Sequence, residues 1–443
     1  MSPAAPQPPK PRQVHPEPKA KEVVQAASPI ASQRDRIITL LFEQIDISAA
    51  AKMESDDLRA ELRPLLLAAT SDLGMTLSSP EQTALEEEIL NELVGLGPLE
   101  PLLDDPSISD ILVNGPNRIF VERSGVLETA PGQFRDDAHL MKVAQRIANG
   151  VGRRVDQSSP LVDARLACGS RVNIVAKPVS LHGTTISIRK FAEVPLLMND
   201  LIDSACSQKM ADTLKIATEA RFNILISGGT GSGKTTLLNA LSAMIDPTER
   251  IVTIEDAAEL RLQQPHVVSL ETRPPSVEGK GEIDVRDLVV NALRMRPDRI
   301  ILGEVRGTEA FQLMQAMNTG HDGTLATLHA SSPREAMTRL EHMVLMANAS
   351  LPRAALVRQI TRSVDMIVQV HRFADGTRRI TDIVEVTGLE GETPQLQTLH
   401  EYEVTEEAGT VGGHFVTTGS NTTLGPKARA RGLEAAYREA AAL

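Results

Sequence analysis

The chain has few cysteines and few aromatic residues. Of its 443 residues, two are cysteines (Cys168 and Cys206), aromatic residues make up 2%, and tryptophan is absent. Two cysteines can build neither a disulfide framework nor a four-cysteine zinc site. We therefore expect a reducing compartment such as the cytoplasm, and hydrophobic cores made from Leu, Ile, Val, Ala and Met.

The sequence also lacks long apolar runs and a net positive charge. No apolar stretch approaches the ~20 residues of a membrane span, and the N-terminus has no apolar centre of the kind a signal peptide needs. The formal net charge of -12 argues against general nucleic-acid binding, which draws its affinity from basic surface. A local basic pore stays compatible with this charge. Work at a membrane would require partners that hold the chain there.

The length suits two or three folded units, and changes in composition suggest where they lie. The N-terminal segment is rich in Pro, Ala, Gln and Lys, a composition that favours disorder. After it, apolar residues recur at helical spacing, and Ser79 with Gln82 is expected to cap a helix that has Pro80 in its first turn. The expected order is a disordered tail (1–33), a helical bundle (34–95), an α+β domain (96–190), a linker (191–199), an α/β domain (200–390) and a C-terminal tail (391–443).

Short apolar runs bounded by turn residues predict the strands of both larger domains. In the α+β domain the expected strands are 108–113, 118–123, 161–165, 171–176 and 184–189, with a helix over 137–151. In the α/β domain they are 223–227, 251–255, 299–303 and 324–329, followed by a hairpin of 366–371 and 379–386. Because strands of the second domain alternate with helices, we expect a parallel sheet with helices on both faces.

One stretch of the α/β domain fits the phosphate-loop pattern G-x-x-x-x-G-K-[ST] at every fixed position. It follows an apolar run (222–226) and precedes an expected helix (236–245), and its residues are Gly228, Gly229, Thr230, Gly231, Ser232, Gly233, Lys234 and Thr235. The glycines allow backbone N–H groups to turn toward an anion at the start of the helix. Lys234 is expected at the β- and γ-phosphates of ATP, and Thr235 at Mg²⁺. We count Thr236, where the expected helix starts, with this site.

Two further strands end in carboxylates. Glu304 closes the run 299–303, and Glu255 closes the run 251–254. Ligands of parallel sheets sit at the carboxyl ends of the strands, where a glutamate can polarise water for attack on the γ-phosphate. Both residues are candidates for catalysis and for contact with Mg²⁺ through water. The alternatives are an exposed strand-end acid for Glu304 and a helix-capping acid for Glu255.

Histidines and arginines supply the remaining candidates. His321 precedes the strand 324–329 and His329 ends it, where a neutral imidazole can sense the γ-phosphate or hold a carboxylate. Arg165, Arg171 and Arg189 lie on strands of the preceding domain, and an arginine from a neighbouring unit can stabilise the charge that spreads over the phosphate in the transition state. A solvated surface position is the alternative for each arginine.

Four segments together resemble the nucleotide motifs of the secretion ATPase superfamily. They are similar to its Walker A motif (228–235), Asp box (254–260), atypical Walker B motif (294–307) and His box (317–323). With the segments 96–103 and 169–173, the chain is most similar to the CpaF/TadA branch, the motors of Tad (Flp) pili. In one departure, Ala167 and Cys168 stand where that branch usually has Pro-Asp.

The resemblance implies an α/β fold in which an N-terminal helical bundle and a PAS-like α+β domain precede a RecA-like P-loop ATPase domain. It implies ATP and Mg²⁺ as cofactors and a homo-hexameric ring with nucleotide bound between the two larger domains. In that family pattern Glu304 is the catalytic glutamate, Glu255 the Asp-box acid, and His321 and His329 the His-box residues. Arg165, Arg171 and Arg189 resemble the arginines that approach the phosphates from the N-terminal domain.

We therefore expect a bacterial, cytoplasmic ATPase held at the inner membrane by pilus platform proteins. It would power assembly of a Tad/Flp type IV pilus, with retraction left open, and it would make no direct contact with nucleic acid. A type IV secretion ATPase that moves protein or DNA is the alternative within the same enzyme class. A nucleotide-gated scaffold with slow hydrolysis is the alternative from another class.

Overall fold

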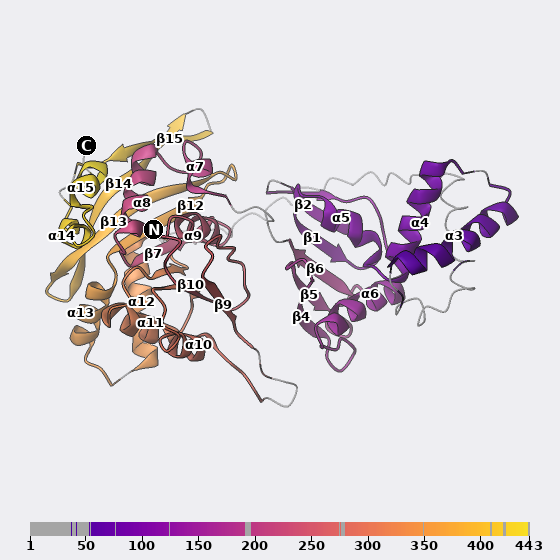
Figure 1. Cartoon of the computed structure of the whole chain (residues 1–443), viewed down its shortest axis with the longest axis horizontal. Coiled ribbons are helices and arrows are strands. Elements are labelled where there is room, and N and C mark those ends of the chain that lie inside the picture. Colours follow the sequence, from indigo (N-terminus) through magenta and orange to yellow (C-terminus); the bar gives the residue numbers. More distant parts are fainter. Residues whose placement is uncertain are drawn as a thin grey trace, which may run out of the picture. The chain divides into compact units, whose positions relative to one another are not determined.

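The computed structural model divides the chain into two compact units, residues 1–190 and 191–443, which Figure 1 colours along the sequence. It describes residues 55–75, 77–123, 125–190, 196–273, 280–348, 350–407, 410–419 and 422–441, together with Ile37, Leu41, Met53 and Pro275. The expected tail 1–33 and most of the expected linker lie outside the described residues. No helix in the described ranges is long and apolar enough to cross a membrane.

The first unit begins with two helices that share their own small core. Helices α3 (Ser55–Asp72) and α4 (Ser79–Leu93) bury leucines against each other, and Ile37 and Leu41 join the same cluster. The cap of α4 lies one residue earlier than expected. Ser78 is the N-cap, and its backbone N–H donates to the carboxylate of Glu81 (2.8 Å). Glu81 is therefore the capping-box partner, and the prediction of Gln82 for this position was wrong by one residue.

The rest of the first unit is an antiparallel sheet with a helix on one face. After η1 (Gly97–Leu99) and α5 (Glu100–Asp104), the strands are β1 (Ile108–Asn114), β2 (Ile119–Arg123), β3 (Val126–Thr129), β4 (Leu161–Arg165), β5 (Arg171–Val175) and β6 (Thr185–Arg189). Their order in the sheet is β3-β2-β1-β6-β5-β4. Helix α6 (Asp137–Gly150) contributes Leu140, Val143 and Ile147 to the core that covers one face.

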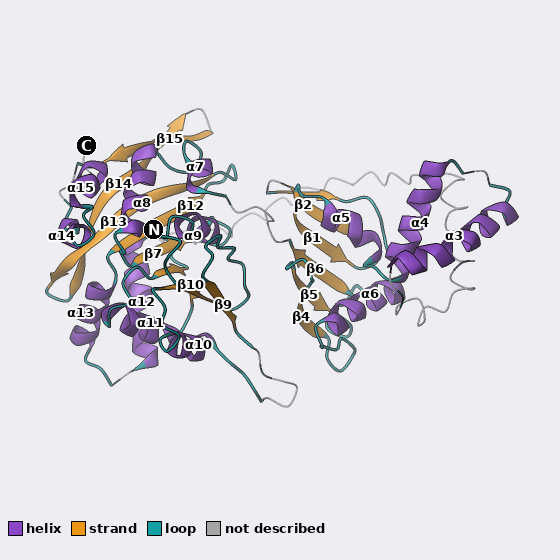
Figure 2. Cartoon of the chain, viewed as in Figure 1, coloured by secondary structure: helices purple, strands orange, loops and turns teal. Residues whose placement is uncertain are grey.

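The second unit is built on a nine-stranded mixed sheet with the order β15-β14-β13-β12-β7-β11-β10-β8-β9, drawn in orange in Figure 2. The parallel part consists of β7 (Ile224–Gly228), β8 (Ile251–Glu255), β9 (Val267–Glu271), β10 (Arg299–Val305), β11 (Leu325–Leu328) and β12 (Met366–Arg372). The antiparallel part adds β13 (Arg378–Glu390), β14 (Thr393–Glu407) and β15 (Thr410–Thr417).

Helices cover both faces of this sheet, as the alternation of strands and helices predicts. One face buries Ile224 and Ile226 of β7 against the helices α8 (Gln208–Glu219), α9 (Lys234–Ser242) and α15 (Glu434–Ala441). The other face buries Leu225 of the same strand. The helices on that face are α10 (Val285–Ala292), α11 (Glu309–Asn318), α12 (Pro333–Ala347) and α13 (Arg353–Ser363). Because successive side chains of a strand point to opposite faces, the fully buried β7 contributes to two cores at once. Two short helices complete the unit, α7 (Met198–Leu201) and α14 (Gly425–Arg429).

Residues 391–443 differ from the expected tail, because they belong to the second unit. β14 pairs with β13 and carries β15 on its other edge. α15 places the fully buried Tyr437 edge-on to Phe222 at 5.0 Å, and the Tyr437 hydroxyl donates to Glu385 (2.9 Å). The apolar residues of the segment are spread over two strands and two short helices. Apolar residues at this spacing form no periodic pattern that would predict the contribution of the segment to the core.

Candidate phosphate site

The residues of the phosphate loop connect β7 to α9, and the loop is closed by tight backbone approaches. Gly231 and Gly233 have φ angles of +68° and +100°, a region that side chains disfavour. A Cβ on Gly228 would lie 2.5 Å from both Ser232 Oγ and the Val370 carbonyl oxygen, whereas a Cβ on Gly229 would meet nothing within 4 Å. Ser232 Oγ donates to the Gly229 carbonyl (2.9 Å) and fixes the turn.

Lys234 begins α9 and folds back onto its own loop. Its ammonium donates to the carbonyl oxygens of Gly228 (3.0 Å) and Gly229 (2.8 Å). Burial lowers the pKa of Lys234, the nearby Glu304 carboxylate raises it, and Arg306 lowers it again. Lys234 and Glu304 are thus near enough to interact electrostatically, although β11 lies between β7, which leads into the phosphate loop, and β10.

Glu304 is the next-to-last residue of β10, and its carboxylate is held by an arginine two residues further on. The guanidinium of Arg306 binds the Glu304 carboxylate (2.6 Å) and the Asp256 carboxylate (2.7 Å). Although burial opposes the charge, the carboxylates of Glu304, Asp256 and Glu259 raise the pKa of Arg306. Arg306 therefore cross-links the ends of β10 and β8.

Glu255, the other expected acid, is 4% exposed at the end of β8. Its carboxylate accepts hydrogen bonds from the backbone N–H groups of Glu259 (2.8 Å) and Leu260 (3.1 Å). It also packs against Gly303, where a Cβ would lie 2.9 Å from Glu255 Cγ. Glu255 thus shapes the loop after β8, and any catalytic role for it stays a prediction.

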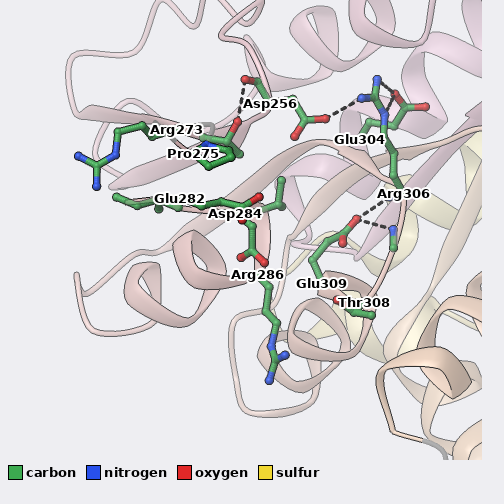
Figure 3. A pocket seen from close by; sticks show the side chains of 14 residues that line it. Asp256, Arg273, Pro275, Glu282, Asp284, Arg286, Glu304, Arg306, Thr308 and Glu309 are labelled. Carbon is green, nitrogen blue, oxygen red and sulfur yellow. Dashed lines mark hydrogen bonds and ion pairs between the residues drawn. The ribbon is translucent and has the colours of Figure 1, made fainter. Parts of the chain in front are cut away.

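A cavity of about 480 Å³ opens beside Glu304. Figure 3 shows Asp256, Glu304 and Arg306 joined at one end of it, while Arg273 and Arg286 point away from that cluster. The acid Glu309 accepts from the backbone N–H groups of Arg306 (2.5 Å) and Gly307 (2.8 Å), which fixes the turn from β10 into α11. The cavity is lined by Asp256, Thr272, Arg273, Pro275, Glu282, Ile283, Asp284, Val285, Arg286, Glu304, Arg306, Gly307, Thr308 and Glu309.

The two histidines lie beyond opposite ends of the central strand β11. His329 follows β11, whose last residue pairs in register with Ser227 of β7. His329 therefore lies at the same end of the strands as the phosphate loop. His321 precedes β11 and accepts a hydrogen bond at its carbonyl oxygen from Thr324 Oγ1 (2.9 Å). The N–H groups of Gly323 and Thr324 in turn donate to the side-chain oxygen of Asn223 (3.0 Å each). The structure therefore groups His329 with Glu304 and the phosphate loop but separates His321 from them by the length of a strand.

The three arginines of the first unit form a row across its sheet. Arg165 of β4 pairs in register with Arg171 of β5, which pairs in register with Arg189 of β6. Paired residues of antiparallel strands share a face, and the buried Val172 and Ile188 alternate with the arginines. The row thus lies on the face opposite the core. The approach of this row to a nucleotide stays a prediction.

The residues present suit a nucleoside triphosphate with Mg²⁺. Gly228, Gly231 and Gly233 leave a cradle that a Cβ would fill or strain, and the first N–H groups of α9 would donate to an anion bound there. Beside the phosphates, Mg²⁺ usually binds one or two protein oxygens and keeps several water ligands. Thr235, Glu304 and Asp256 could supply such oxygens, directly or through water. Among the described residues no group of three or more His, Cys, Asp or Glu side chains could hold a metal alone.

The sequence analysis predicted neither Asp256 nor Arg306 as site residues. It also did not predict Arg372 and Arg378 of the β12–β13 hairpin. Arg306 carried a usable signal, because it stands two residues after a strand-end carboxylate. The hairpin arginines gave none, since only the pairing of β12 with β7 brings them to the phosphate loop.

Comparison with known families and proteins places this site in context. The profile of the family described as "Type II/IV secretion system protein" matches residues 92–409. A putative conjugal transfer protein of Mycobacterium tuberculosis is 39% identical over 335 residues, which is 73% of this chain and 94% of that protein. The type IV secretion system protein PtlH of Bordetella pertussis is 38% identical over 321 residues, 66% of this chain and 94% of that protein. The conjugal transfer protein TrbB of Rhizobium radiobacter is 32% identical over 310 residues, 69% of this chain and 91% of that protein.

Solved structures give a weaker likeness. The VirB11 ATPase of the Brucella suis type IV secretion system is 30% identical, with a TM-score of 0.36 over 65% of this chain and 94% of that one. The Legionella pneumophila ATPase DotB is 22% identical, with a TM-score of 0.47 over 62% of this chain and 76% of that one. The relationship accordingly rests on the family profile and the sequence relatives.

Proposed function

The chain belongs to the type II/IV secretion system protein family, and on that premise we propose that it is a Mg²⁺-dependent ATPase that drives a secretion or pilus machine. The fold that this implies is a RecA-like ATPase domain preceded by a PAS-like domain. The observation that carries the proposal is that the adjacent parallel strands β7, β11 and β10 end on the same side of the sheet. Lys234, Glu304 and His329 all lie at these carboxyl ends, and Lys234 and Glu304 interact electrostatically.

Each side chain has a separate task in this proposal. The amides of the loop and Lys234 bind the β- and γ-phosphates and hold them at the start of α9. Mg²⁺, when bound beside Thr235, would neutralise phosphate charge. Glu304 orients the attacking water and accepts its proton, and Arg306 holds the Glu304 carboxylate in place. His329 contacts the γ-phosphate side from β11.

The test is a pair of variants in the full chain. Glu304→Gln should lower the rate of ATP hydrolysis by about 10²-fold or more, the usual contribution of a general base, while ATP affinity stays close to that of the unmodified chain. Lys234→Ala should lose ATP binding itself. Steady-state phosphate release and equilibrium nucleotide titration measure the two effects. Unchanged turnover in Glu304→Gln removes Glu304 from the mechanism, and unchanged affinity in Lys234→Ala removes the phosphate loop.

For the machine that is driven, we propose assembly of a Tad/Flp pilus by a homo-hexamer that acts on inner-membrane platform proteins from the cytoplasm. The motif resemblance over 294–307, 96–103 and 169–173 supports this choice. The names of the relatives from Mycobacterium, Rhizobium and Bordetella favour a second candidate, a type IV secretion or conjugation ATPase. Neighbouring genes separate the two, since pilin genes support the first and conjugation genes the second.

A nucleotide-gated scaffold would bind ATP at the same loop without working as a motor. It predicts that the unmodified chain hydrolyses ATP no faster than Glu304→Gln does. Light scattering with and without nucleotide tests the ring, and a monomer under all conditions would contradict the hexamer.

A further inference from the structure

The hairpin between β12 and β13 places two arginines against the phosphate loop. β12 runs parallel to β7, with Val370 in register with Gly228, so the hairpin extends past the sheet edge beside the loop. Arg378 Nε donates to the Gly231 carbonyl oxygen at 2.9 Å. A Cβ on Gly231 would lie 3.4 Å from Arg372 Nη1, and one on Gly233 would lie 3.6 Å from Arg378 Cδ. Both side chains therefore border the glycines that shape the loop.

The strand pairing puts the two charges on the same face. Arg372 and Arg378 are directly opposite each other across the hairpin, and like charges in opposed positions of an antiparallel pair destabilise it. Within the part of the chain that the structure describes, no carboxylate forms an ion pair with either arginine. The nearby acid, Asp375, accepts hydrogen bonds from Thr377 N (2.9 Å) and Thr377 Oγ1 (2.7 Å) and so serves the turn.

The next position along the hairpin shows what a structural arginine looks like here. Arg379 pairs with His371 on the opposite face of the strands. Its guanidinium carbon lies 4.9 Å from the centre of the Tyr402 ring, and Nη1 donates to the Ser204 carbonyl oxygen (3.3 Å). Arg379 is thus held by groups on the other face of the hairpin, whereas Arg372 and Arg378 lie beside the glycines of the phosphate loop.

We propose that Arg372 and Arg378 bind the phosphate chain of the nucleotide from the same subunit as the phosphate loop. The inference rests on the proposed function and adds a second wall to that site. A guanidinium suits this task because it offers several N–H donors to phosphate oxygens in a fixed plane. The bound phosphates would at the same time relieve the repulsion between the two arginines. Arg378 would act both on the nucleotide and, through Gly231, on the shape of the loop.

The experiment compares four full-length variants, Arg372→Ala, Arg378→Ala, the double variant and Arg379→Ala as the matched control. Equilibrium titration with ATP, ADP and adenosine should show about tenfold weaker binding of ATP and ADP for each single change, the size expected for one charge-assisted hydrogen bond. Adenosine affinity should stay unchanged, because adenosine carries no phosphate. The KM for ATP should rise while kcat stays within about twofold, the pattern of uniform binding.

A purely structural role would give a different result. It would lower the affinity for adenosine together with that for ATP, and it would lower the thermal midpoint without nucleotide in Arg378→Ala. Arg378→Lys, which keeps the charge, should recover part of the ATP affinity. The inference is overturned if the double variant binds ATP as the unmodified chain does, or if Arg379→Ala weakens ATP as much as Arg378→Ala. An unmodified chain that binds no ATP overturns the proposed function instead.

Discussion

At the residue scale, the site depends on side chains that hold other side chains. Glu304 would polarise water, but its carboxylate is fixed by Arg306, which is itself tied to Asp256. Glu255 accepts from the amides of the next loop and packs on Gly303. The acids at the ends of β8 and β10 thus serve two purposes. The half-buried Glu304 and the exposed Asp256 are bridged by an arginine, whereas the buried Glu255 shapes the backbone.

Replacing Arg306 by Ala should lower kcat and leave ATP affinity nearly unchanged. Without the guanidinium, Glu304 loses the contact that positions it and faces Asp256 as a like charge. A catalytic group that is misplaced by about 1 Å can lose about 10²-fold in rate, and we expect a loss of at least about tenfold. Single-turnover hydrolysis and nucleotide titration separate the two quantities.

Arg286→Ala is the control for this change, because Arg286 lines the same cavity but points away from Glu304 in Figure 3. It should leave kcat within about twofold. A faster rate in Arg306→Ala would mean that the arginine restrains Glu304 rather than positions it, and a similar loss in both variants would point to the cavity as a whole.

Among single residues, the sequence was informative where a motif fixes a backbone position. The phosphate loop and Glu304 could be placed because a strand, a turn and a helix follow each other within a few residues. The positions of the two histidines were harder to predict. They are eight residues apart in sequence, but the strand between them places them at its opposite ends. The hairpin arginines could not be found, since their contact with Gly231 joins residues 147 positions apart.

At the element scale, the strands with short apolar runs were predicted correctly. The expected strands 161–165, 171–176 and 251–255 correspond to β4, β5 and β8, and the expected hairpin is formed by β12 and β13. The sheet is mixed rather than wholly parallel, because β13, β14 and β15 add antiparallel strands. β13, β14 and β15 pair as consecutive hairpins. Local spacing does not reveal the contacts distant in sequence that hold the C-terminal segment on the second unit, such as Tyr437 on Phe222.

His400 joins three elements and should make the second unit sensitive to acid. The fully buried imidazole of β14 contacts Thr213 Oγ1 of α8 (2.8 Å) and Thr417 Oγ1 of β15 (3.1 Å). Burial, assisted by the charge of Lys209, lowers the pKa of His400 from 6.5 to about 4. Because the unfolded chain binds a proton more readily, the neutral form stabilises the fold fully above pH 6.5, and this contribution is lost as the pH falls toward 4.

The loss amounts to about 3 kcal/mol over that range, at 1.36 kcal/mol for each unit of pKa shift. Denaturant unfolding between pH 7 and pH 4.5 can be followed by tyrosine fluorescence, since both tyrosines, Tyr402 and Tyr437, lie in the second unit. His400→Gln should reduce the dependence on pH, and the difference between the two chains isolates this histidine from titrating carboxylates. Equal slopes in both would contradict the assignment.

At the scale of the whole molecule, the two units have separate hydrophobic cores. The clusters that hold the sheet of the second unit contain only residues from 198 onward, and those of the first unit end at Ile188. A unit with its own core can fold alone. The phosphate loop and Glu304 lie in the second unit, whereas the row formed by Arg165, Arg171 and Arg189 lies in the first.

A fragment of residues 191–443 should therefore fold and bind ATP but hydrolyse it slowly. If the arginine row completes the site in the full chain, its absence should cost about 10³-fold in kcat, the lower bound for an arginine that stabilises phosphoryl transfer in trans. Because removal of the first unit can also change the oligomeric state, the triple change of Arg165, Arg171 and Arg189 to Ala in the full chain serves as the matched variant, with light scattering to check its assembly. A triple variant that assembles and hydrolyses ATP at the rate of the unmodified chain would show that the nucleotide site of the second unit is catalytically complete by itself.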